Sequence, residues 1–181
     1  MTMTTTLART GSALAAAGLL IGMLSACTPE SKPTPKPTRT AAFATDEEAY
    51  AAAEETYRAY MAAYNKVDFA DPSSFDVTRD FVVGDYSAQE RKTLSELHAK
   101  GYTRTGTTEI LEFEGDRVDG DVVVAITCND VSGTNIVDST GQSVVAPDRR
   151  NVYSLKLTFA YASSRLRLAD STPVEDATCT G

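Results

Sequence analysis

The spacing of apolar residues along the chain changes near residue 102, from a helical period to an alternating one. Before that point apolar side chains recur every three or four positions, as they do on one face of an α-helix. This pattern predicts a first helix over residues 45–66. Its start is marked by a capping box, in which Thr45 accepts a hydrogen bond from the backbone of Glu48 and the Glu48 side chain reaches back.

Two more helices are predicted before the period changes. A short helix over residues 71–82 begins with an Asp-Pro pair, which is typical of a helix start. A third helix begins at Ser87, which forms a second capping box with Glu90, and it ends before Gly101.

Beyond residue 102 the chain is rich in β-branched and aromatic residues that alternate with polar ones. The turn residues Gly115 and Asp116 are expected to end the first strand. Strands are predicted over residues 103–114, 121–128, 152–162 and 165–169, with 129–137 as an extension of the second strand. Helices followed by an antiparallel meander predict an α+β domain, with three N-terminal helices packed on a curved antiparallel sheet.

Tyrosines lie on the apolar face of the first predicted helix, at Tyr50, Tyr57, Tyr60 and Tyr64. A buried phenol needs a hydrogen-bond partner for its hydroxyl group. Tyr57, Tyr60 and Tyr64 are therefore either residues at the edge of the core or residues that line a wet cavity. Both interpretations stay open from the residues alone.

The first 26 residues have the pattern of a signal peptide, with Arg9 as their only charge and an apolar stretch over 11–24. A transmembrane helix needs roughly 20 apolar residues, so this stretch is too short to span a membrane. The Leu-Ser-Ala-Cys sequence at 24–27 resembles the lipobox of bacterial lipoprotein precursors. That resemblance implies that Cys27 carries a diacylglyceryl group and begins the mature chain. An uncleaved anchor with an incidental cysteine is the alternative.

This interpretation divides the chain into a signal peptide (1–26), Cys27 with a Pro-rich basic stem (27–41) and one domain (42–181). The stem holds four of the seven prolines and no large apolar residue, so we expect an extended spacer. The predicted location is the outer face of the cytoplasmic membrane, with the membrane as a partner through the lipid anchor.

The charge of the chain excludes one class of partner. The net charge is −8, and because Arg9 and a net +2 in the stem lie outside it, the region from residue 42 onward carries −11. Nucleic-acid binding draws its affinity from the neutralisation of phosphates. We therefore expect no nucleic-acid partner.

Cys128 and Cys179 are expected to form a disulfide. Outside the cytoplasm, an even pair of cysteines without Cys-x-x-Cys spacing is typical of a structural bridge. The alternative is a pair of free thiols with a redox or nucleophilic role. Such a role needs a nearby base, and His98 is the only histidine in the sequence.

The residues predict no catalytic set, metal site or cofactor. His98 beside Glu96 falls short of the three or four ligands that a zinc site uses. Asp130 and Asp138 do not have the spacing of an EF-hand loop. The sequence also contains no glycine-rich phosphate loop and no nucleophilic serine elbow.

The segment from Tyr60 to Asp68, Tyr-Met-Ala-Ala-Tyr-Asn-Lys-Val-Asp, followed by Phe75, resembles the end of the first helix in the NTF2-like superfamily. This superfamily includes SnoaL-like and ketosteroid-isomerase-like proteins. The order of elements agrees over about residues 45–172. As a whole, the chain resembles uncharacterised NTF2-like lipoproteins of high-GC Gram-positive bacteria.

The resemblance implies a cone whose open end holds a small ligand, with Tyr57, Tyr60 and Tyr64 as its lining. Tyr60 matches the place of a tyrosine that, in the isomerase branch, donates a hydrogen bond to the developing oxyanion. Residues 81–86 contain no match for the general base of that branch. A phenol without a base does not abstract a proton at a useful rate, so isomerase chemistry is not carried over.

Three functional hypotheses follow. The favoured one is a lipid-anchored, non-catalytic binding or interaction module of the cell envelope, which engages a small ligand or another envelope protein. The second is a SnoaL-like or isomerase-like enzyme that uses Tyr60, and the third is a structural envelope protein with a filled cone. A homodimer formed through the exposed face of the sheet is a further candidate partnership.

Overall fold

The structure, a computed structural model, describes residues 42–175 and residue 179. The predicted signal peptide, Cys27 and the stem lie outside these residues. Within the described part, no helix has the length and apolar character needed to cross a membrane. The elements in chain order are α1 (Asp46–Tyr64), η1 (Pro72–Thr78), α2 (Gly84–Ala99), β1 (Thr103–Thr105), β2 (Glu109–Asp119), β3 (Val122–Asp130), β4 (Asn135–Val137), β5 (Val152–Ala162) and β6 (Arg165–Pro173).

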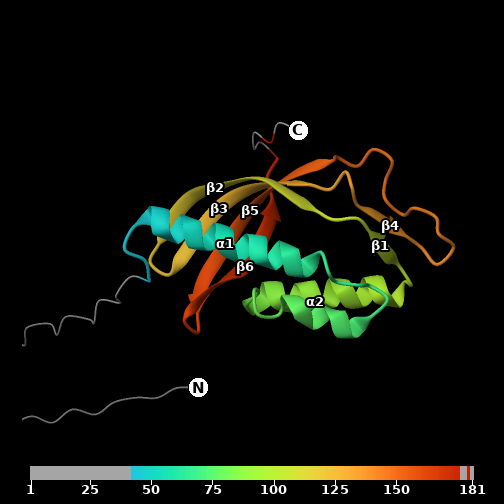
Figure 1. Cartoon of the computed structure of the whole chain (residues 1–181), viewed down its shortest axis with the longest axis horizontal. Coiled ribbons are helices and arrows are strands. Elements are labelled where there is room, and N and C mark those ends of the chain that lie inside the picture. The colour runs from blue at the N-terminus through green and yellow to red at the C-terminus, as the bar shows by residue number, and fades with distance from the viewer. Residues whose placement is uncertain (1–41, 176–178, 180–181) are drawn as a thin grey trace, which may run out of the picture. The chain divides into compact units, whose positions relative to one another are not determined.

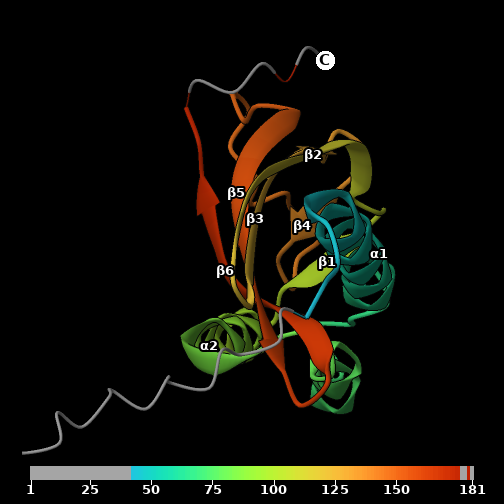
Figure 2. The same cartoon turned by 90° about the vertical axis from the view of Figure 1, so that its left-hand side faces the viewer.

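Strands β2, β3, β5 and β6 form an antiparallel sheet in that order, and β1 pairs with β4 in a separate two-stranded sheet. Helix α1 lies along one face of the curved large sheet, and α2 lies beside its lower end (Figures 1 and 2). The predicted α+β class, with three helices packed on a curved antiparallel sheet, is confirmed. The second helix is a 3-10 helix, η1, and is shorter than predicted.

The core lies between α1 and the large sheet. Small side chains at Ala49 and Ala53 let the helix approach the strands closely, and both are fully buried. Apolar side chains of the sheet face them, each with 0% exposure: Val123, Ala125, Leu157, Phe159 and Leu168. Helix α1 begins as predicted, because Thr45 Oγ1 accepts a hydrogen bond from the Glu48 backbone at 3.2 Å.

Strand β2 runs through the turn that the sequence predicts at Gly115. The ring of Tyr50 on α1 lies over Gly115, and a Cβ atom at that position would overlap the ring. The glycine therefore serves the close approach of a helix side chain to a strand. The prediction that a turn ends the strand here is wrong.

The predicted strand over 103–114 is two strands in different sheets. The chain bends between them at Gly106, which has a φ of 74°. A Cβ atom at Gly106 would overlap the carbonyl oxygen of Gly133, so the bend needs glycine for two reasons. The prediction that residues 129–137 extend the strand that is now β3 holds for Asn129 and Asp130. Beyond Asp130 the prediction is wrong, because β4 belongs to the small sheet.

Helix α2 begins at Gly84, about one turn before the predicted start. Its N-cap residue, Val83, has no side-chain cap. Backbone pairing with the sheet sets this start, because the Val83 N–H donates to the carbonyl oxygen of Leu168 on β6 at 2.9 Å. The capping box predicted at Ser87 is therefore wrong, and Glu90 instead makes contacts inside the fold.

Cys128 and Cys179, the pair expected from the sequence, lie at disulfide distance, with their Cα atoms 5.6 Å apart. Neighbouring side chains on a strand point to opposite faces of the sheet. Cys128 therefore lies on the face of β3 that is opposite to the face carrying Asn129. The bridge holds the chain beyond β6 against β3.

Candidate functional site

A cavity of about 360 Å³ lies between α1, α2 and the large sheet. Its volume falls within the range of small-molecule sites. Helices α1 and α2, strands β3, β5 and β6, and the segments next to β2 and β3 all contribute to its wall. The lining residues are Tyr57, Tyr60, Met61, Tyr64, Tyr86, Gln89, Glu90, Thr93, Leu94, Thr108, Asn129, Val131, Tyr153, Leu155 and Ser171.

The three tyrosines that the sequence nominates as cone lining, Tyr57, Tyr60 and Tyr64, all contribute to this wall. They follow one another along a single face of α1, because residues three and four apart are neighbours on a helix. The ring centroids of Tyr57 and Tyr60 are 6.0 Å apart, and those of Tyr60 and Tyr64 are 5.9 Å apart. The side chains of Tyr57 and Tyr60 are only 2% and 4% exposed, so their hydroxyls need partners inside the protein.

Glu90 of α2 supplies the partner for Tyr60. The Tyr60 hydroxyl donates to Glu90 Oε2 at 2.5 Å, and the hydroxyl of Thr78, which is 1% exposed, donates to Oε1 at 2.6 Å. The hydroxyl oxygen of Tyr86 lies 3.1 Å from that of Tyr60. One carboxylate of the cavity wall thus collects hydrogen bonds from η1 and α1.

Asn129 supplies the partner for Tyr57. It lies on β3, is 4% exposed, and donates from Nδ2 to the Tyr57 hydroxyl oxygen at 2.6 Å. Hydrogen-bonded polar groups from the helices and the sheet therefore meet in one cavity.

Burial keeps the cavity tyrosines neutral. Desolvation raises the pKa of Tyr57 to about 12, and together with the nearby Tyr86 and Glu90 it raises the pKa of Tyr60 well above that of an ordinary phenol. Burial also raises the pKa of Tyr86 and of Tyr64, with Arg104 opposing the shift at Tyr64. At neutral pH these phenols therefore act as hydrogen-bonding groups.

An alkaline titration is expected to show that these phenols ionise late. The phenols of the unfolded chain ionise near pH 10, whereas Tyr57, Tyr60 and Tyr86 have raised pKa values in the fold. A raised folded-state pKa stabilises the fold fully below pH 10, and this stabilisation is lost as the pH rises from 10 through 12. Near-UV absorbance of phenolate, recorded with far-UV circular dichroism, should show a late group of tyrosines that ionises together with unfolding. Ionisation of all eight tyrosines in one step near pH 10, with the fold intact, would contradict this expectation.

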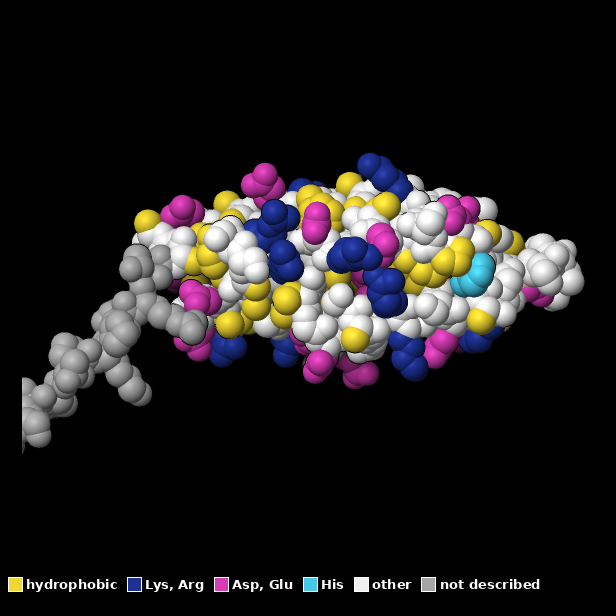
Figure 3. Space-filling view, turned by 90° about the horizontal axis from the view of Figure 1, so that it is seen from below, with side chains coloured by type: hydrophobic (Ala, Val, Ile, Leu, Met, Phe, Trp, Pro, Cys, Tyr) yellow, Lys and Arg dark blue, Asp and Glu magenta, His cyan; other side chains and the backbone are white. Residues whose placement is uncertain are grey.

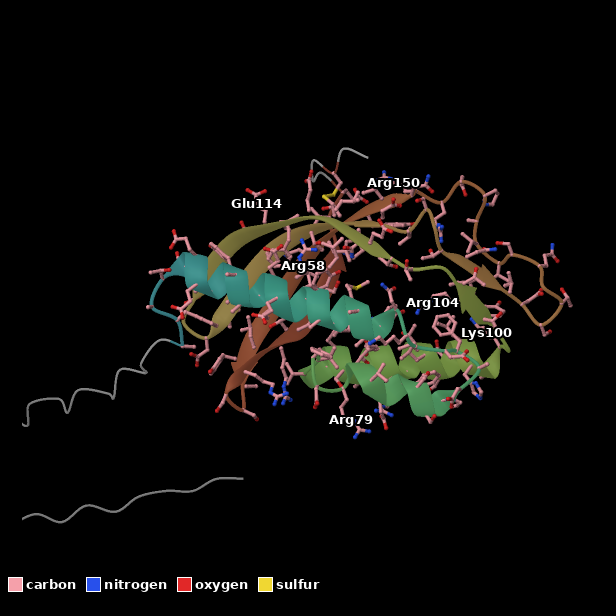
Figure 4. The ribbon with its side chains drawn as sticks, in the orientation of Figure 1. Arg58, Arg79, Lys100, Arg104, Glu114 and Arg150 are labelled. Carbon is pink, nitrogen blue, oxygen red and sulfur yellow. A yellow bond between two sulfur atoms is a disulfide. The ribbon has the colours of Figure 1, made fainter. Side chains whose placement is uncertain are left out.

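Arg104 of β1 holds the end of α1 beside the cavity (Figure 4). Its Nη2 atom donates to the carbonyl oxygens of Tyr64 at 2.8 Å and Val67 at 3.2 Å. The guanidinium also lies 5.0 Å from the ring centroid of Tyr64 and 5.5 Å from that of Phe69. The last carbonyls of a helix lack intrahelical donors, so this cation donates to the carbonyl of the last residue of α1, Tyr64, and to that of Val67 in the segment after it. It also contacts the Tyr64 ring that lines the cavity.

Two residues singled out in the sequence do not belong to the cavity wall. Nδ1 of His98 lies 2.8 Å from the carbonyl oxygen of Phe69, and its ring meets that of Phe75 edge-on, so it packs α2 against η1. Asp68 accepts a hydrogen bond from the backbone N–H of Ala70 in a turn. Across residues 42–175 and residue 179, no group of three or more His, Cys, Asp or Glu side chains gathers as metal ligands do.

The sequence analysis missed Tyr86, Glu90 and Asn129 as members of the site. Tyr86, Glu90 and Leu94 are spaced four residues apart, which places them on one face of a helix. An acidic residue between a tyrosine and a leucine on such a face is the signal that could have identified Glu90.

No family model matches the chain, and no curated protein matches it. Among solved structures, the intermembrane-space region of the chloroplast protein ARC6 is similar with a TM-score of 0.50 at 12% identity, over 70% of this chain and 97% of that one. A provisionally assigned aromatic ring hydroxylase from Novosphingobium aromaticivorans has a TM-score of 0.51 at 13% identity, over 71% and 89% of the two chains. A provisionally assigned NTF2-like dehydratase from Streptomyces avermitilis has a TM-score of 0.46 at 11% identity, over 72% and 99%. At such identities, the first two likenesses show that this chain shares its α+β fold with proteins of dissimilar sequence, and they show the fold alone.

Proposed function

We propose that this chain is a lipid-anchored binding module of the cell envelope, and that it holds a small molecule in the cavity between α1, α2 and the sheet. The cavity itself is the observation that carries this proposal. It has about 360 Å³ of space, with Glu90, Tyr60 and Tyr86 at one end. A concave, mostly apolar site with a few convergent polar groups is the usual form of a ligand pocket. A filled cone, as in a structural envelope protein, would not leave this space.

The N-terminal sequence supports the location. The lipobox at Cys27 follows an apolar stretch, and the Pro-rich stem after it would hold the domain away from the bilayer. The bridge between Cys128 and Cys179 fits an oxidising compartment outside the cytoplasm. A homodimer or another envelope protein on the exposed face of the sheet remains part of this proposal.

The contact between Tyr60 and Glu90 favours a second candidate, a small-molecule enzyme. A phenol that donates to a carboxylate at 2.5 Å places an acid and a base side by side in the cavity wall. Catalysis would require a substrate atom within reach of both groups. The enzyme hypothesis fails if Tyr60→Phe leaves every measured activity and ligand affinity unchanged.

The anchor is tested by Cys27→Ser. We expect the wild-type chain to begin at Cys27, carry the mass of a diacylglyceryl group and enter the detergent phase. The Cys27→Ser chain should carry no lipid mass, because serine has no thiol to form the thioether. Intact mass spectrometry of both chains from a bacterial host reports the difference. A mass difference that the Cys-to-Ser change alone explains, with the same detergent partition for the two chains, would contradict the anchor.

The binding function is tested by filling the cavity. Ser171 lines the cavity from β6, so Ser171→Trp would add volume inside it without removing an apolar core side chain. Native mass spectrometry of the protein purified from its own envelope should show a retained small molecule on the wild-type chain and none on the Ser171→Trp chain. Ser95→Trp is the control, because Ser95 is exposed on α2 and does not line the cavity. A wild-type chain that retains nothing, or a Ser171→Trp chain that retains as much, would contradict binding in the cavity.

A further inference from the structure

Three hydroxyl hydrogens around Glu90 are already used. Tyr60 donates to Glu90 Oε2, and Thr78 donates to Glu90 Oε1. Because the Tyr60 hydrogen points to Glu90, Tyr86 must be the donor in the 3.1 Å contact between the two phenols. Tyr86 thus donates to Tyr60, and Tyr60 and Thr78 each donate to Glu90. The lone pairs that remain on Glu90 and on the Tyr86 oxygen can only accept, so a ligand group that contacts these oxygens must supply donors.

The charge of the lining residues also favours a ligand that supplies hydrogen-bond donors. Among the residues that the structure describes, Glu90 is the only lining residue with a formal charge at neutral pH, and the lining includes no Lys, Arg or His. Arg79, which follows η1, and Arg91 of α2 pair with Asp76 at the exposed surface. Basic and acidic side chains are interspersed on the lower face of the molecule (Figure 3). A partly buried carboxylate without a cationic partner is stabilised by a ligand that brings a positive charge.

Arg149 and Arg104 both contact lining residues, and both cations are already engaged. Arg149 donates to the carbonyl oxygens of Val131 at 2.8 Å and Thr134 at 3.0 Å. Arg104 is engaged in a similar way. It lies on the ring of Tyr64 and donates to two backbone carbonyl oxygens, those of Tyr64 and Val67. It is not itself part of the wall. The net charge of −11 from residue 42 onward also favours the approach of a cation over that of an anion.

The other lining residues form a mostly apolar surface, which can contact the apolar part of a ligand that carries a positive charge. Met61, Leu94, Val131 and Leu155 contribute aliphatic surface. Aromatic rings at Tyr57, Tyr60, Tyr64, Tyr86 and Tyr153 complete it, and aromatic rings attract cations. The space between them admits a molecule with a short hydrocarbon or aromatic group.

We propose that the cavity binds a small organic amine in its protonated form. Its N–H groups donate to Glu90 and to the oxygen of Tyr86, and its apolar part lies against Met61 and Leu155. This inference rests on the proposed binding function and adds the chemical class of the ligand.

The test uses three probes of similar size: phenethylamine as the cation, phenethyl alcohol as its neutral counterpart and phenylpropionate as the anion. Calorimetric titrations use the full lipidated chain in a non-ionic detergent at neutral pH. We expect the amine to bind at least about tenfold more tightly than the alcohol, because hydrogen bonds to a charged group are the stronger ones. Phenylpropionate should not bind.

The variant Glu90→Gln should weaken amine binding by about tenfold to a hundredfold and leave alcohol binding nearly unchanged. Glu55→Gln is the matched control, because Glu55 lies exposed on α1 and its loss changes the net charge by the same amount. That control should bind the amine as the wild type does. If Glu90→Gln does not fold, the affinities of the wild-type chain for the amine and the alcohol still test the proposal.

Alcohol or carboxylate binding as tight as amine binding would overturn this inference and leave the binding function standing. An equal loss of amine affinity in Glu90→Gln and Glu55→Gln would also overturn it, because the effect would then belong to net charge. Binding of none of the three probes at millimolar concentration overturns it as well. The binding function itself fails by a separate result, the absence of any retained molecule on the wild-type chain.

Discussion

Reduction of the bridge between Cys128 and Cys179 is expected to lower the free energy of unfolding by about 4 kcal/mol. The two residues are 51 positions apart, so the bridge removes much of the conformational freedom of the unfolded chain. It also ties the chain beyond β6 to β3, the strand that carries Asn129 into the cavity. Reduction should therefore loosen the site as well as the fold.

Urea unfolding with and without a reductant measures this effect. The reductant should lower the unfolding midpoint of the wild-type chain and leave that of Cys179→Ala unchanged, because this variant has no bridge to reduce. Cys179 is the position to replace, since Cys128 is only 5% exposed and its removal would also disturb the sheet. Equal midpoints for oxidised and reduced wild-type protein would show that the bridge does not stabilise the fold.

Replacement of Arg104 by methionine is expected to cost about 3 kcal/mol of stability. Methionine keeps an unbranched side chain but removes the donors to the carbonyl oxygens of Tyr64 and Val67, and a hydrogen bond from a charged group contributes roughly 1.5 to 3 kcal/mol. It also removes the cation from the rings of Tyr64 and Phe69. The Tyr64 ring should then lose its position at the cavity wall, and ligand affinity should fall.

Arg79→Met is the matched control for this change. Arg79 has a side chain that is 61% exposed and pairs with the exposed Asp76, and such surface ion pairs contribute little. Both arginines are labelled in Figure 4. Chemical denaturation should therefore show a large loss for Arg104→Met and a small one for Arg79→Met. Equal losses would mean that the contacts of Arg104 at the end of α1 do not stabilise the fold.

The sequence predicts the parts of this fold that local interactions determine. The start of α1 follows from hydrogen bonds within four residues of Thr45. The Glu48 backbone donates to Thr45 Oγ1 as in a capping box. The Glu48 carboxylate accepts from the backbone N–H of Ala44, one residue before the cap. The periodic placement of Tyr57, Tyr60 and Tyr64 follows from helix geometry alone. Helix geometry therefore places these tyrosines on one face of α1, whereas their role as cavity lining was implied only by the resemblance to the NTF2-like superfamily.

The features that escape prediction depend on contacts between distant segments. The start of α2 is set by pairing of Val83 with Leu168, which overrides the local cap at Ser87. Gly115 has the composition of a turn, but its role is to admit the ring of Tyr50 from α1. The spacing of neighbouring residues in the sequence does not reveal partners that lie in distant segments. For the same reason the sequence analysis did not predict Glu90 as a site residue, because its two hydrogen-bond donors come from α1 and η1.

The central claim is that the cavity beside Glu90 is a site for a small molecule. Crystals of the protein purified from its own envelope test this most directly. We predict electron density for a small molecule in the cavity, with a donor atom within hydrogen-bond distance of a Glu90 carboxylate oxygen and an apolar part near Leu155. Density for side chains or ordered water alone, in crystals grown from freshly purified protein, would contradict the claim.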